Sequence, residues 1–149
     1  MDQMPLDSSP IRILLVEDNP GDVRLTAETF HTGKVANELH VAKDGEDAMA
    51  FLRRETPHTG AQRPDLVILD LNLPRKDGIE VLAEIKQDDS LHVIPIVILT
   101  TSAAERDVLQ SYKLKANAYI TKPIDVHDFI AAVTSIEDFW LNIVRLPRA

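Results

Sequence analysis

The sequence predicts an α/β fold, a doubly wound parallel sheet with helices on both faces. Short apolar runs rich in Ile, Val and Leu alternate with segments of helical periodicity, and this order repeats five times. The runs show little polar alternation, which is typical of strands that are buried on both faces. Alternation at this spacing implies right-handed crossovers. The 149 residues fit one domain.

Five apolar runs are the expected strands. The three strongest are Ile11–Val16, Leu66–Leu69 and Ile94–Leu99. Two weaker runs, Glu38–Ala42 and Ala116–Thr121, are expected as flanking strands. The strong runs therefore predict the centre of the sheet, where both faces are covered by helices.

Helical periodicity fills the space after each run, and cap residues mark three helix starts. Asn19-Pro20 combines a cap residue with proline at the first helical position. Asp44-Gly45 opens the second helix, and Asp125 can cap the fifth. The apolar positions that define the five helices are Val23, Ala27 and Phe30; Ala48, Phe51 and Leu52; Gly78, Val81, Leu82 and Ile85; Val108, Leu109 and Tyr112; and Val126, Phe129, Ile130, Val133, Ile136, Trp140 and Ile143.

Composition excludes several classes of function. The absence of cysteine excludes disulfides, zinc fingers, iron–sulfur ligation and thiol catalysis. A net charge of -8 argues against non-specific nucleic-acid binding, which needs Lys and Arg to displace counterions. No apolar run approaches the roughly 20 residues that span a bilayer, and the start lacks a signal-peptide pattern. We therefore expect a cytoplasmic protein with no nucleic-acid or membrane partner, a frayed tail over residues 1–10 and one domain over residues 11–145.

Polar side chains stand where the expected strands end. Glu17 and Asp18 follow the first strand, Asp70 the third, Thr100 the fourth and Lys122 the fifth. Ligands of open parallel sheets bind beyond these carboxyl ends. Converging carboxylates repel one another unless one is protonated or a cation lies among them, and such oxygen ligands favour Mg²⁺ or Mn²⁺. With a lysine and a hydroxyl nearby, the pattern favours phosphoryl transfer to Asp70.

Other polar patterns are less specific. Asn72-Leu73-Pro74 and Asp77-Gly78 fit turns, and a backbone carbonyl near residue 72 is compatible with completing a metal shell. The five histidines show no ligand spacing, and we expect them at the surface. The five glycines form neither a dinucleotide-binding fingerprint nor a P-loop.

Taken together, these residues resemble the response-regulator receiver domain of two-component signalling. The motifs occur in the family's order and spacing and cover nearly the whole chain. The resemblance implies a flavodoxin-like (βα)5 fold with strand order 2-1-3-4-5. The matching pieces are L-L-V-E-D-N (Leu14–Asn19), V-I-L-D-L-N-L-P (Val67–Pro74), K-D-G (Lys76–Gly78), I-V-I-L-T-T-S-A (Ile96–Ala103) and A-Y-I-T-K-P (Ala118–Pro123).

The resemblance implies a role for each acidic residue. Asp70 matches the phosphoacceptor, which takes its phosphoryl group from a phosphohistidine of a sensor histidine kinase. Glu17 and Asp18 match the acidic pair that holds Mg²⁺. Asn72 matches the position whose backbone carbonyl is a further metal ligand.

Three further residues match the family's switch. Thr100 matches the switch hydroxyl, Lys122 the phosphate-binding lysine and Tyr119 the aromatic residue that turns inward on activation. The Lys122-Pro123 bond matches a site that is commonly cis. Phosphorylation is then expected to change the surface of the fourth helix, fifth strand and fifth helix.

The fifth helix is expected to run on to about Val144. Its exposed apolar stripe of Phe139, Trp140, Ile143 and Val144 predicts a homodimer interface. The alternative is that the stripe folds back onto its own domain. This ending and the insertion Thr56–Pro64 resemble the small stand-alone receivers that are associated with phytochrome-type histidine kinases.

Two other functions compete with a phosphorylatable receiver. One is a phosphatase of the haloacid dehalogenase type, which needs a second Asp two residues after its nucleophile. This chain has Asn72 there, so we expect no turnover enzyme. The other is a docking module that is never phosphorylated, and the intact set of strand-end residues argues against it.

Overall fold

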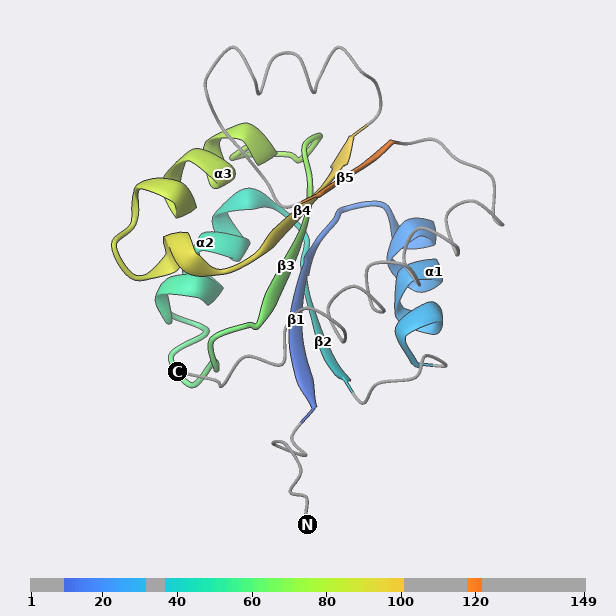
Figure 1. The fold of residues 1–149 in the computed structure, drawn as a ribbon, viewed down its shortest axis with the longest axis horizontal. Coiled ribbons are helices and arrows are strands. Elements are labelled where there is room, and N and C mark those ends of the chain that lie inside the picture. The colour runs from blue at the N-terminus through green and yellow to red at the C-terminus, as the bar shows by residue number, and fades with distance from the viewer. Residues whose placement is uncertain (1–9, 32–36, 101–117, 122–149) are drawn as a thin grey trace.

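A computed structural model describes residues 10–31, 37–100 and 118–121, which form a parallel sheet with helices on both sides (Figure 1). The strand order is β2-β1-β3-β4-β5, so the expected doubly wound topology is confirmed. The strands are β1 (Ile11–Val16), β2 (Asn37–Ala42), β3 (Leu66–Asp70), β4 (Ile96–Thr100) and β5 (Ala118–Thr121).

Among the described residues, three helices and a short 3-10 turn connect the strands. α2 and α3 lie on one side of the sheet and α1 lies on the other (Figure 1). The bounds are α1 (Pro20–His31), α2 (Gly45–Arg53), α3 (Gly78–Gln87) and η1 (Leu91–Val93). The expected fourth and fifth helices, with the Asp125 cap, lie outside the described residues.

The predicted caps are present at the first two helices. The Asn19 side chain accepts a hydrogen bond of 3.0 Å from the Asp22 backbone N–H, and α1 begins at the following proline. The Asp44 carboxylate accepts from the Asp47 N–H at 2.8 Å and caps α2.

The sheet divides the apolar interior into two clusters. All five residues of β3 are buried, as a strand covered on both faces requires. One cluster joins β1, β3 and β4 to α2 and α3, with Val81, Leu82 and Ile85 among its members. The other includes Leu15, Phe30 and Ile68 and lies on the α1 side.

The fourth strand starts two residues later than the apolar run predicts. Ile94 is buried, but it caps η1 and donates its N–H to the Leu91 carbonyl. Pro95 has no N–H to give to a ladder, although its carbonyl accepts from Val67. The strand therefore begins at Ile96, and the prediction for Ile94 was wrong because packing, not pairing, makes that position apolar.

The predicted insertion Thr56–Pro64 is a loop without helix or strand, and its Thr56–Pro57 peptide is cis. Within the three described ranges, every helix is too short or too polar to cross a membrane. Outside them lie Lys122, the Lys122-Pro123 bond, most of the N-terminal tail and the predicted dimer stripe of Phe139, Trp140, Ile143 and Val144.

Candidate metal and phosphorylation site

Three carboxylates meet at the carboxyl ends of β1 and β3. These strands are neighbours, with Val16 opposite Leu69, so the residues that end them lie close together. Glu17, Asp18 and Asp70 each offer one carboxylate oxygen, and these oxygens lie within 4.8 Å of one another. Glu17 is 1% exposed and Asp70 is 3% exposed, whereas Asp18 faces solvent. The structure thus brings together the three acidic residues that the sequence predicts.

Backbone hydrogen bonds hold the two buried carboxylates in place. The Asn19 N–H donates to Glu17 Oε2 at 3.2 Å, and the Asn72 N–H donates to Asp70 Oδ1 at 3.0 Å. Both are turns in which a side chain accepts from the residue two positions later. The turns begin where the ladders end, since the Glu17 N–H donates to the Ala42 carbonyl and the Leu71 N–H to the Leu99 carbonyl.

The donor set fits a hard divalent cation. At 4.8 Å, the upper limit of these separations, two carboxylates repel by about 3.5 kcal/mol at an effective dielectric constant of about 20. A divalent cation among the oxygens turns this repulsion into attraction, and oxygen-only ligands suit Mg²⁺, Mn²⁺ or Ca²⁺. Asp18 is the exposed member of the cluster, so one of the three carboxylates faces solvent.

The loop that follows β3 returns tightly to the sheet. The Gly78 N–H donates to the Leu71 carbonyl at 3.0 Å. A Cβ atom on Gly78 would lie 2.5 Å from the Leu71 Cα and closer still to the Asp70 carbonyl oxygen. Only glycine allows α3 to start this near the acidic cluster.

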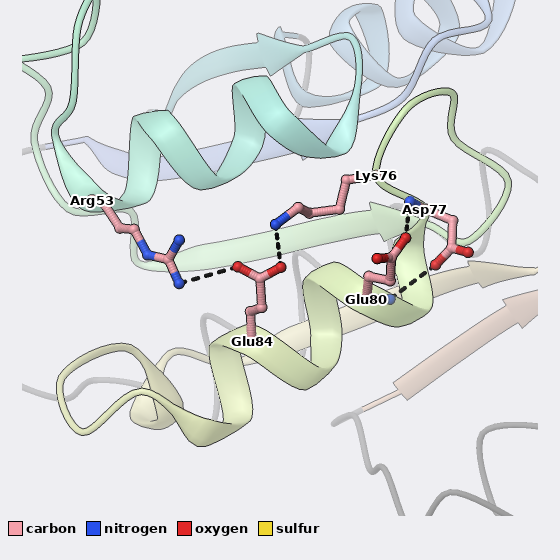
Figure 2. A network of polar contacts seen from close by, with 5 residues as sticks. All are labelled: Arg53, Lys76, Asp77, Glu80 and Glu84. Carbon is pink, nitrogen blue, oxygen red and sulfur yellow. Dashed lines mark hydrogen bonds and ion pairs between the residues drawn. The ribbon is translucent and has the colours of Figure 1, made fainter.

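The same loop is held in place by a polar network that the sequence did not predict. Lys76 forms an ion pair with Glu84 on α3, and Glu84 also binds Arg53 on α2 at 3.1 Å (Figure 2). Beside it, Asp77 and Glu80 form a capping box at the start of α3 (Figure 2). The ion-pair partners come from three separate segments, so no spacing in the sequence could have revealed them.

The other predicted site residues are only partly placed. Asn72 is exposed and its N–H contacts Asp70, as described above. Thr100 ends β4 opposite Thr121, and Tyr119 pairs with Ile98 in the sheet. The side chains of Thr100 and Tyr119 lie outside the described part, as does all of Lys122.

Two of the histidines expected at the surface are half-buried and pack against an aromatic ring. His40 on β2 stacks on Phe51 with ring centroids 4.1 Å apart, and His58 packs edge-on against both. His58 Nε2 lies 2.7 Å from Asp47 Oδ1 and ties the insertion loop to α2. Burial lowers the pKa of His40, and the nearby His58 lowers it further against the opposing effect of Asp47.

Comparisons with known proteins agree with this geometry. Response regulator Rcp1 of Synechocystis is 49% identical over 144 residues, which are 96% of this chain and 98% of Rcp1. The crystal structure of the Mn²⁺-bound form of Rcp1 has a TM-score of 0.85 at 50% identity and covers 93% of this chain and 100% of that chain. The phosphorylated cyanobacterial phytochrome response regulator RcpA has a TM-score of 0.86 at 48% identity and covers 94% and 100%.

The family comparison covers both the sheet and the acidic cluster. The response regulator receiver domain matches residues 13–134, from β1 through the region after β5. The chain therefore belongs to the family of response regulator receiver domains.

Proposed function

We propose that this receiver accepts a phosphoryl group on Asp70 from a phosphohistidine of a sensor histidine kinase, in a Mg²⁺-dependent reaction. Glu17, Asp18, Asp70 and the Asn72 backbone carbonyl would hold the metal. The observation that carries the proposal is the cluster of three carboxylate oxygens within 4.8 Å, two of them on buried side chains. The Mn²⁺-bound form of the similar protein Rcp1 supports a divalent metal here.

The reaction exchanges one bond to phosphorus for another. An Asp70 carboxylate oxygen attacks phosphorus as the bond to the histidine nitrogen breaks, and the nitrogen keeps the electron pair. The Asn72 N–H, at 3.0 Å from Oδ1, fixes the carboxylate for this attack. A bound divalent cation supplies charge neutralisation for the phosphoryl oxygens. Lys122 adds a positive charge in the proposed site.

The proposed output is a change of surface. Thr100 would follow the new phosphoryl group and Tyr119 would take the space, which would change the surface expected from the fourth helix, β5 and the fifth helix. We also propose that the protein acts in the cytoplasm, in a phosphorelay, as a receiver and not as a turnover enzyme. Hydrolysis of the acyl phosphate by water releases inorganic phosphate and restores the Asp70 carboxylate.

Intact mass measures the reaction directly. Incubation with Mg²⁺ and phosphoramidate should add about 80 Da, the mass of one phosphoryl group. Asp70→Asn should remain unmodified. Continuous phosphate release over many turnovers would instead favour the dehalogenase-type phosphatase, and failure to form any adduct with small donors or kinases would favour a docking module.

The proposed kinase is of the phytochrome type. RcpA is a phytochrome response regulator, and its similarity over nearly the whole chain supports this partner. A phytochrome-type kinase labelled with radioactive phosphate should transfer it to this chain within minutes and at a rate that depends on illumination. A kinase from an unrelated system should transfer it far more slowly. Equal rates from both kinases would refute the phytochrome link.

We also propose a homodimer through the fifth helix, with Phe139, Trp140, Ile143 and Val144 at the interface. An apolar stripe of this kind is typical of a partner surface. Light scattering should give the mass of two chains for the wild type and of one chain for Trp140→Glu. An unchanged mass in that variant would refute this interface.

A further inference from the structure

The loop between β3 and α3 is held at Lys76, four residues beyond Asn72. The backbone of Lys76 rests directly on Gly45, the first residue of α2. A Cβ atom on Gly45 would lie 2.7 Å from the Lys76 carbonyl carbon and 2.8 Å from its Cβ. Real Cβ atoms essentially never approach so closely, so the start of α2 is open to this loop only because residue 45 is glycine.

The Lys76 side chain is held from the opposite side. Its ammonium group pairs with Glu84 on α3, and the other Glu84 oxygen binds Arg53 on α2 (Figure 2). Lys76 and Glu84 are only 26% and 27% exposed, so their pair is better shielded from water than a surface ion pair. One residue of the loop is thus clamped between two helices.

Arg75 adds a weaker contact beside this clamp. Its backbone is in the left-handed region with φ of 66°, and its side chain lies 3.6 Å from Asp44 and 3.7 Å from Glu46. Arg75 is 68% exposed, so these pairs contribute little to stability. The Arg75 ion pairs and the Lys76 backbone thus contact the same first turn of α2.

We propose that Lys76 is a positioning residue for the metal site. By fixing the loop to α2 and α3, it sets the position of the Asn72 carbonyl beside Asp70. The inference rests on the proposed function, because it requires a divalent cation at the acidic cluster. Lys76 acts through the loop geometry, since its charge is neutralised by Glu84.

The direction in which one substitution changes the metal affinity distinguishes a positioning role from a purely electrostatic one. Lys76→Met keeps most of the length of the side chain and removes its charge. If Lys76 acted only through its charge, the loss of a cation from the loop that follows Asp70 would leave metal binding unchanged or tighten it. Positioning predicts the opposite, a dissociation constant for Mn²⁺ that rises about tenfold, as is typical when the support of a metal ligand is lost.

Mn²⁺ binding can be followed by electron paramagnetic resonance of the free ion in the absence of any phosphodonor. Lys86→Met makes the same charge change in the last turn of α3 and should leave the dissociation constant within about twofold of wild type. Lys76→Arg keeps a cation for Glu84 and should retain most of the affinity. Unfolding curves in metal-free buffer show that each variant is folded.

The outcomes are distinct. Unchanged or tighter Mn²⁺ binding by Lys76→Met overturns the positioning role, whereas a wild type that fails to bind Mn²⁺ overturns the metal site of the proposed function. If Lys76→Met does not fold, Gly45→Ala takes its place and should weaken binding. Its matched control is Gly60→Ala, where the added Cβ meets nothing within 4 Å, and equal binding by the two alanine variants overturns the inference.

Discussion

Replacing Asp70 with asparagine should stabilise the metal-free protein. Asp70 and Glu17 are buried with carboxylate oxygens no more than 4.8 Å apart, which corresponds to about 3.5 kcal/mol of repulsion at an effective dielectric constant of about 20. Relief from the exposed Asp18 adds at most about 1 kcal/mol. Asparagine keeps an oxygen for the Asn72 N–H but loses the charge, at a cost of about 1 kcal/mol. The expected net gain is about 3 kcal/mol.

Urea unfolding in EDTA measures this gain, and the same experiment in MgCl₂ tests its cause. The cation stabilises the wild type by binding its folded state, and Asp70→Asn should bind it more weakly, so the difference should shrink or reverse. Asp89→Asn makes the same chemical change at an exposed position and should alter stability by less than about 0.5 kcal/mol. The reasoning is refuted if Asp70→Asn is no more stable than wild type in EDTA, or if Mg²⁺ leaves its advantage unchanged.

Four further predictions concern stability. Gly78→Ala should cost roughly 1–3 kcal/mol in urea unfolding because its Cβ meets the Leu71 backbone, whereas Gly60→Ala should be nearly neutral. Asp77→Ala removes the capping box of α3 and should cost about 1 kcal/mol, with faster amide exchange in the first turn if the cap is the cause. Ile98→Ala should cost about 2–5 kcal/mol and Val93→Ala almost nothing, since the first side chain is fully buried and the second is 64% exposed; similar losses would contradict the burial argument. The pKa of His40 in the folded state lies below its unfolded value near 6.5, so the contribution of His40 to stability is fully present above that pH and is lost as the pH falls through the folded-state pKa. Unfolding curves from pH 8 to pH 5 should therefore show a smaller loss of stability for His40→Phe than for wild type. An equal loss of stability would contradict the assignment.

Much of the fold could be predicted because the central strands obey simple rules. A strand buried on both faces must be apolar throughout, so Leu66–Leu69 was visible as a run, and parallel pairing then requires a crossover after it. The acidic cluster was predictable for the same reason, since Glu17 directly follows β1 and Asp70 is the last residue of the neighbouring β3. The start of β4 could not be predicted. A buried isoleucine before a proline gives the same sequence pattern whether its backbone pairs with a neighbouring strand or its side chain only packs in the core.

Contacts between distant side chains could not be predicted. Nothing in the sequence links Arg53, Lys76 and Glu84, since ion pairs between different segments have no fixed spacing. The stack of His40 and His58 on Phe51 was missed for a similar reason, because an insertion loop gives no periodic signal. Sequence patterns reveal which residues are buried and which strands end together, whereas the choice of polar partners depends on the final positions of the helices.

The division of the interior by the sheet has a consequence for how the protein can vary. The residues around Phe30 pack with α1, and those around Leu82 pack with α2 and α3, with the sheet between them. Destabilising changes on opposite faces should therefore add independently, while changes within one cluster should couple. The core residues on the α1 face can therefore be substituted, in evolution or by design, while the α2–α3 face keeps its packing. The α2–α3 face carries the loop beside Asp70.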